Sequence, residues 1–119
     1  MGTEKMTFGA YLRSLRRQKR LSQKELADMV QMDHTYLSKI ETEVLPPPSE
    51  KNIKKLAQVL DVSEDELLVL ALKAPSDLNE VITKDKSIPS ILRRARNLSS
   101  SDWKEVEKLI NKLRKEEDE

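Results

Sequence analysis

The 119-residue sequence contains no cysteine, one histidine and two glycines, and only 3% of its residues are aromatic. Without cysteine the chain forms neither a disulfide nor a thiolate metal site, and one histidine excludes a multi-histidine site. Two glycines are too few for a glycine-rich phosphate loop. No pair of acids accompanies a nucleophile, so an enzyme is the class of protein least compatible with the sequence. We expect no metal and no cofactor.

Long apolar runs are also missing, since none approaches the roughly 18 residues that a membrane-spanning helix needs. The N-terminus lacks the basic and then apolar pattern of a secretory signal. These two absences lead us to expect a cytoplasmic protein with no membrane contact. Charge, by contrast, is plentiful: residues 1–60 carry 11 basic and 7 acidic side chains, and residues 61–119 carry 11 and 14. The first half can attract phosphate, whereas the second suits a dimerisation or partner segment.

Apolar residues recur at helical spacing, and Ser-x-x-acid boxes at Ser22, Ser63 and Ser99 mark helix starts. We predict helices over about residues 7–19, 22–30 and 49–60, one starting at Asp33 and one starting at Ser63. The prolines at positions 46–48 prevent the third helix from continuing. The five helices make residues 1–73 an all-α domain.

The run from Leu67 to Leu72 has no polar face, so it must be covered on more than one side. Another subunit or the C-terminal segment would cover its outer face, and we assign Leu68 and Leu72 to such a contact. The alternative is a frayed, strand-like tail.

Residues 74–86 have the composition of a linker, and residues 87–119 are predicted to form a helical segment for dimerisation or partner docking. A short helix is expected over about residues 87–97 and a final one from Ser99 to about residue 115. Two heptad repeats are too few for an independent coiled coil, so the apolar face of the final helix must dock on its own domain or pair within a dimer. This face, the seam, consists of Trp103, Val106, Leu109, Ile110 and Leu113.

An ordered set of residues links Phe8 to Leu72: Leu12, Arg16, Leu21-Ser22-Gln23, Glu25-Leu26-Ala27, Tyr36, Ser38-Lys39-Ile40-Glu41, Leu56-Ala57, Leu60, Val62-Ser63 and Glu66-Leu67. With this set, a little over half of the chain resembles the phage repressor/Cro-like, or XRE-type, helix-turn-helix domain. The resemblance implies a five-helix, lambda-repressor-like fold that binds double-stranded DNA as a dimer, with one helix in the major groove.

The resemblance also implies roles for single residues. Base edges are read from the second helix of the motif by His34, Thr35, Ser38 and Lys39. Phosphate contacts fall to Arg13, Arg17, Gln23, Tyr36, Thr42, Lys51 and Asn52. In the family, an Arg at the position of Arg16 and a Glu at that of Glu41 pair beneath the surface and fix the pose of the recognition helix.

Several of these residues have a plainer interpretation. Gln23 and His34 could be solvated surface residues, and Arg17 could belong to a solvated charge run with Lys19 and Arg20. Tyr36 either contacts phosphate through its hydroxyl or packs beside the second helix. The sequence leaves these alternatives open.

At three turn positions where the family commonly has Gly or Asn, this sequence has Arg20, Gln31 and Glu43. The family's residues there favour a left-handed backbone, which costs a non-glycine residue on the order of 1 kcal/mol. Glu43 also places a negative charge where the family's backbone approaches phosphate. It should weaken DNA binding unless its side chain turns away.

The sequence therefore predicts a sequence-specific DNA-binding transcriptional regulator, a repressor that binds a near-palindromic operator as a homodimer. The alternative is an antitoxin-type or protease-controlled regulator whose C-terminal segment binds a partner protein such as a toxin or a protease. The two differ in whether the seam pairs with itself or with another protein.

Overall fold

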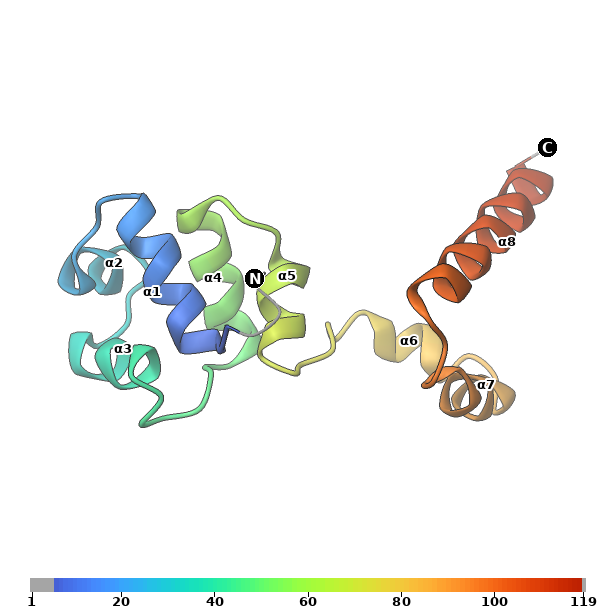
Figure 1. Ribbon diagram of the computed structural model, residues 1–119, viewed down its shortest axis with the longest axis horizontal. Helices are drawn as coiled ribbons and strands as arrows, with labels where there is room; N and C mark the ends of the chain where they lie inside the picture. Colours follow the sequence, from blue (N-terminus) through green and yellow to red (C-terminus); the bar gives the residue numbers. More distant parts are fainter. Residues whose placement is uncertain (1–5, 119) are drawn as a thin grey trace. The chain divides into compact units, whose positions relative to one another are not determined.

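A computed structural model describes the backbone of residues 6–118 and the side chains of residues 6–116. Within this range all regular structure is helical, which confirms the predicted all-α class (Figure 1). The helices are α1 (Phe8–Gln18), α2 (Gln23–Met29), α3 (His34–Glu41), α4 (Glu50–Leu60), α5 (Glu64–Leu70), α6 (Leu78–Ile82), α7 (Ser87–Ala95) and α8 (Ser100–Asp118). The chain forms two compact units, one ending at Ser76 and the other beginning at Asp77.

The predicted capping boxes start helices in the structure. The Ser22 hydroxyl accepts the Glu25 N–H at 3.0 Å, and the Glu25 carboxylate accepts the Ser22 N–H at 2.9 Å. Hydrogen bonding to the Glu25 carboxylate from the Ser22 backbone, and after it from the Ser22 side chain, lowers the pKa of Glu25. Ser99 and Asp102 make the same reciprocal pair of bonds before α8.

At α5 the box is only half used. The Ser63 hydroxyl accepts the Glu66 N–H at 3.4 Å, but the Glu66 carboxylate accepts a hydrogen bond from the Tyr11 hydroxyl of α1. That bond is the main cause of the raised pKa of Tyr11. Glu66 thus ties α5 to α1 as well as starting its own helix.

Each of the five helices in the first unit ends with one residue in the left-handed backbone region. The N–H of that residue donates to the carbonyl three positions back, and the next N–H donates to the carbonyl five positions back, which is the Schellman arrangement. At α1 these bonds are Arg20 N–H to Arg17 O at 3.0 Å and Leu21 N–H to Arg16 O at 3.1 Å. The left-handed residues are Arg20, Gln31, Glu43, Asp61 and Leu72, with φ of 57°, 58°, 67°, 58° and 59°. The left-handed positions expected at Arg20, Gln31 and Glu43 are therefore confirmed.

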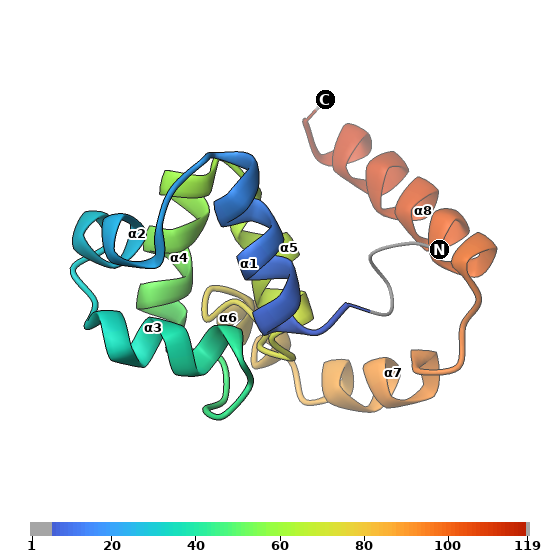
Figure 2. The same ribbon diagram turned by 60° about the vertical axis from the view of Figure 1, so that its left-hand side comes forward.

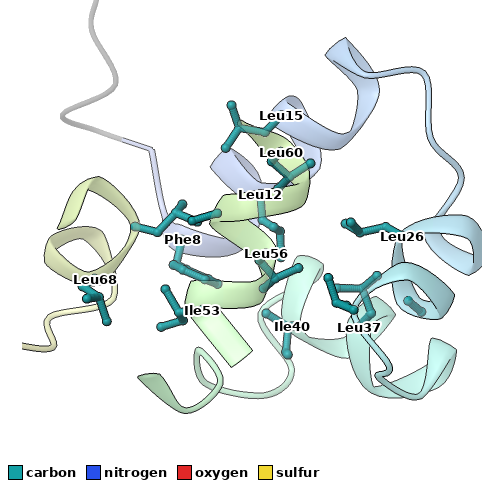
Figure 3. Packing of buried hydrophobic residues seen from close by; sticks show 14 residues of the cluster. Phe8, Leu12, Leu15, Leu26, Leu37, Ile40, Ile53, Leu56, Leu60 and Leu68 are labelled. Carbon is teal, nitrogen blue, oxygen red and sulfur yellow. The ribbon is translucent and has the colours of Figure 1, made fainter. Parts of the chain in front are cut away.

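The core of the first unit is built around α4, whose inward residues are Ile53, Leu56, Ala57 and Leu60. Helices α2 and α3 lie on one side of α4 and α5 lies on the other, as Figure 1 and Figure 2 both show. Figure 3 shows the buried side chains that meet α4, among them Phe8 and Leu12 from α1, Leu26 from α2, Leu37 and Ile40 from α3, and Leu68 from α5. Each such aliphatic side chain contributes about 1.5–3 kcal/mol when fully buried.

Helix α1 passes against the last turn of α3 at Gly9. A Cβ atom on Gly9 would lie 2.4 Å from the Ile40 carbonyl oxygen and 2.8 Å from that of Glu41. Only glycine permits backbones to approach this closely. The backbones of α1 and α3 are thus in direct contact at Gly9.

The orientation of α3 is also fixed by a buried polar network. Arg16 Nε donates to Glu41 Oε2 at 2.7 Å, and Arg16 Nη2 donates to Glu41 Oε1 at 2.9 Å. Arg16 Nη1 donates to the Leu21 carbonyl at 2.9 Å, and Gln23 Nε2 donates to Glu41 Oε1 at 3.0 Å. Hydrogen bonding to Glu41 raises the pKa of Arg16. The network joins α1, the turn that follows it, the start of α2 and the end of α3.

Helix α5 differs from the sequence-based expectation in one respect. The assignment of Leu68 to a dimer or partner contact is wrong, because Leu68 is only 1% exposed and packs in the core of its own unit. Leu72 is 94% exposed. The strand-like alternative is also wrong, since residues 64–70 are helical. An apolar run without a polar face does not reveal which of its residues point inward.

Because Gln31 is exposed and left-handed, we predict that Gln31→Gly raises the free energy of unfolding by about 1 kcal/mol. Urea denaturation of the full chain, followed by circular dichroism, measures the change. Gln58→Gly is the matched control, because Gln58 is exposed inside α4, where glycine should cost about 1 kcal/mol. Equal destabilisation by both substitutions would contradict a left-handed conformation at Gln31.

We predict that Glu41→Ala lowers the free energy of unfolding by about 3–5 kcal/mol, because it leaves the Arg16 charge buried without its partner. Glu43→Ala is the control, because Glu43 lies two residues further on and is exposed. Thermal denaturation should show a much larger fall in Tm for Glu41→Ala. Small and equal falls would mean that the pair does not fix α3.

Candidate nucleic-acid interface

Helix α3 turns one face to the core and the other to solvent. Leu37, Ile40 and Glu41 are buried. Since positions three and four apart share a face of a helix, the remaining side chains gather on the other side. Among the predicted base-reading residues, His34, Thr35 and Lys39 are exposed and Ser38 is half-buried.

The start of α3 is fixed by Asp33, whose carboxylate accepts the Tyr36 N–H at 3.3 Å. Tyr36 itself is half-buried and packs against the core. The structure therefore supports the packing interpretation of Tyr36, and its hydroxyl contact with phosphate stays a prediction. A capped and packed α3 offers its polar face as a preorganised surface.

Two of the predicted phosphate ligands are already engaged in hydrogen bonds. Gln23 is half-buried and uses one amide N–H on Glu41, which leaves its second N–H for another acceptor. The Thr42 hydroxyl donates to the Ser38 carbonyl at 3.0 Å. A hydroxyl has a single hydrogen, so a phosphate contact through Thr42 requires this bond to break.

The basic residues predicted to contact phosphate lie on α1 and α4. Arg13 and Arg17 are exposed one turn apart on α1. Lys51 is exposed in the first turn of α4, and Asn52 beside it is half-buried, with its N–H bonded to the Ser49 hydroxyl at 3.4 Å. These side chains can supply positive charge and amide donors to an anionic surface.

Glu43, the acidic residue in the turn after α3, is exposed and left-handed. It is one of the residues that line a surface groove of about 330 Å³ bordered by the start of α1, the loop after α3 and the end of α5. Its predicted repulsion of phosphate stays a prediction.

In the second unit the seam of α8 is open to solvent. Trp103 is 45% exposed, Ile110 51% and Leu113 54%, while Val106 is half-buried and Leu109 is exposed. Across residues 77–116 no side chain is buried. This unit carries apolar side chains at helical spacing but no core of its own.

The described part of the chain offers neither a metal site nor a membrane-spanning helix. No group of three His, Cys, Asp or Glu side chains there could hold a metal ion. Nor does any helix among those residues combine the length and apolar character needed to cross a membrane.

Sequence reasoning did not identify the hydrogen bonds from Gln23 to Glu41 or from Arg16 to the Leu21 carbonyl. Neither has a sequence signature, because the partners are separated in the chain and no spacing rule relates them. The contact of Tyr11 with Glu66 was missed as well, since Glu66 fitted a local capping box.

Comparison with known proteins agrees with this geometry. The helix-turn-helix family profile matches residues 12–67. The chain is similar to SinR, a master regulator for biofilm formation, in its complex with DNA: sequence identity is 35%, the match covers 52% of this chain and 98% of that chain, and the TM-score is 0.50. It is also similar to a chain of the SinR protein/SinI protein complex, at 28% identity over 92% of this chain and 99% of that chain, with a TM-score of 0.50.

No curated protein sequence matches the chain. The family profile falls on the unit that contains α1 to α5. The 35% identity to the SinR chain extends over 98% of that chain. The chain therefore belongs to the XRE-type helix-turn-helix family of DNA-binding transcriptional regulators.

Proposed function

We propose that the protein is a repressor that binds a near-palindromic operator as a homodimer. The observation that carries this proposal is the polar face of α3, exposed to solvent above a buried network that fixes the helix. His34, Thr35, Ser38 and Lys39 then read base edges in the major groove. Lys39 can donate to guanine O6 and N7, and the Thr35 methyl can contact that of thymine.

Phosphate contacts would fix the register of α3 on the duplex. Arg13 and Arg17 supply them from α1, and Lys51 and Asn52 from α4. Gln23 contributes its second amide N–H beside the start of α2, where the helix dipole also favours an anion. These contacts carry no sequence information, but they make affinity strongly dependent on salt concentration.

Dimerisation is supported by the open seam of α8. An isolated helix is only marginally stable in water unless its apolar face is buried. The second unit has no core that could bury the apolar face of α8. A second copy of the seam offers a self-complementary surface. The two recognition helices would then sit one DNA turn apart, about 34 Å, on a near-palindrome.

A second candidate is a regulator whose seam binds a partner protein, such as a toxin or a protease that inactivates it. The same exposed side chains favour it, and the SinR protein, to which the chain is similar, has been solved in a complex with the SinI protein. DNA binding by α3 is common to both candidates. They differ in what covers Trp103 and Ile110.

We expect Lys39→Ala to weaken binding to the operator by about 1–3 kcal/mol and to leave binding to bulk DNA nearly unchanged. Arg13→Ala should weaken binding to the operator and binding to bulk DNA by a similar factor. It should also reduce the slope of log affinity against log salt concentration by about 1. The operator is selected from a random duplex pool with the full chain, and affinities are measured by fluorescence anisotropy. Lys104→Ala, an exposed residue of α8, is the control for loss of one positive charge.

The selection itself can reject the proposal. Failure of any near-palindrome to compete better than bulk DNA would exclude sequence-specific binding. A uniform loss of affinity for Lys39→Ala across all sequences would assign Lys39 to phosphate.

Ile110→Asp should convert the full chain from dimer to monomer, because it places a charge in the centre of the seam. Light scattering after size-exclusion chromatography measures the mass. Asn111→Asp is the matched control, because Asn111 neighbours Ile110, is exposed and lies outside the seam. A monomeric wild-type chain would favour the partner-protein candidate.

A further inference from the structure

The chain leaves the first unit at a residue that is hydrogen-bonded twice to α4. Glu50, the first residue of α4, accepts the Ser76 N–H at Oε1 (3.1 Å) and the Ser76 hydroxyl at Oε2 (2.9 Å). Lys54 Nζ lies 3.1 Å from the same Oε2. Ser76 is the last residue of the first unit, and Asp77 begins the second. We call Glu50, Ser76 and Lys54 the linker clamp.

Glu50 is a firm anchor because the rest of α4 forms the centre of the core. It follows the N-cap Ser49, where a helix favours negative charge. Hydrogen bonding from the Ser76 hydroxyl, and after it from Lys54, lowers the pKa of Glu50. The bonds to Ser76 are therefore made to a charged carboxylate, and such bonds are shorter and stronger than neutral ones.

The segment between α5 and the clamp is held at both ends. Lys73 N–H donates to the Leu68 carbonyl at 2.8 Å, and Ser76 is held by Glu50. Between them Pro75 has a fixed φ, which restricts the segment further. While the clamp is closed, a change in direction between the two units has to occur after Ser76.

We infer that Glu50 and Ser76 are positioning residues that shorten the tether through which the second unit joins two DNA-binding units. This inference rests on the proposed dimeric DNA binding. The length of a tether sets the effective concentration of the second DNA-binding unit at its half-site. Opening the clamp frees residues 74–76 and lengthens each tether by up to roughly 10 Å. The freed units then reach half-sites at more than one spacing.

The first experiment uses limited trypsin digestion of the full chain, which contains a cleavage site at Lys73 inside the clamped segment. Glu50→Gln should accelerate cleavage after Lys73 about fivefold or more relative to cleavage after Lys84, because proteolysis follows local opening. Ser76→Ala removes the hydroxyl donor without changing charge and keeps the N–H bond, so it should have a smaller effect. Glu64→Gln is the matched control, since Glu64 is the first residue of α5, behind the N-cap Ser63, and makes none of the bonds of the clamp.

The second experiment measures affinity for duplexes with one half-site, with two half-sites at the selected spacing, and with two half-sites moved by two base pairs. We expect the wild-type chain to lose about tenfold or more of its two-site advantage when the spacing changes. For Glu50→Gln and Ser76→Ala, the loss of two-site advantage on the same change of spacing should be several-fold smaller. Because the loss is a ratio between two-site duplexes that differ only in spacing, the charge change at Glu50 affects both affinities and cancels.

Three outcomes count against the inference, and they are distinguishable. Equal cleavage after Lys73 in all four chains would show that no clamp holds the segment. Faster cleavage with an unchanged dependence on spacing would overturn the positioning role alone. A wild-type chain without any operator preference would overturn the proposed function, and the positioning role with it, whatever the digestion shows.

Discussion

The bidentate ion pair between Arg16 and Glu41 determines which face α3 turns to solvent, and so which side chains it would present to DNA in the proposed complex. Leu37 and Ile40 hold one side of α3 in the core, but apolar burial is non-directional and tolerates rotation of a helix. Hydrogen bonds are directional, and those to Glu41 come from α1 and from the start of α2 at 2.7–3.0 Å. Such a buried pair contributes little net stability compared with an apolar replacement. Its contribution is the orientation of α3, because any rotation would leave a buried charge without its partner.

The connections between the helices of the first unit contain no glycine, and this has a structural cost. Left-handed backbone is adopted at Arg20, Gln31, Glu43, Asp61 and Leu72, and all five side chains are exposed. Because these side chains point into solvent, they do not clash with other residues, and the only strain is within the residue itself. The Schellman hydrogen bonds satisfy the final carbonyls of each of these helices. At α1 the same arrangement serves the site, because Arg16 bonds to Leu21 through both its carbonyl and its guanidinium.

Most of the fold could be predicted from the sequence because helix starts, apolar periodicity and proline stops act over a few residues. The left-handed turns at Gln31 and Glu43 were visible only through resemblance to a family with Gly or Asn there. Asp61 carries a local signal, since Asp enters this region more readily than most residues, whereas Leu72 carries none. Contacts such as Gln23 with Glu41 and Ser76 with Glu50 could not be predicted, because they depend on where distant helices meet. Periodicity likewise failed at Leu68, where every neighbouring position is apolar.

The two units differ in what stabilises them, and this difference bears on regulation. The first unit buries a continuous core, whereas no side chain of residues 77–116 is buried. In the proposed dimer the apolar face of α8 is covered by a second copy, and in the alternative it is covered by a partner protein. Both would use the same side chains, so a partner that occupied the seam would separate the two DNA-binding units of the proposed dimer. Each unit would then bind its half-site alone, and affinity for the operator would fall because the effective concentration of the second unit is lost. Control of this kind requires no change in α3 or in the network that orients it.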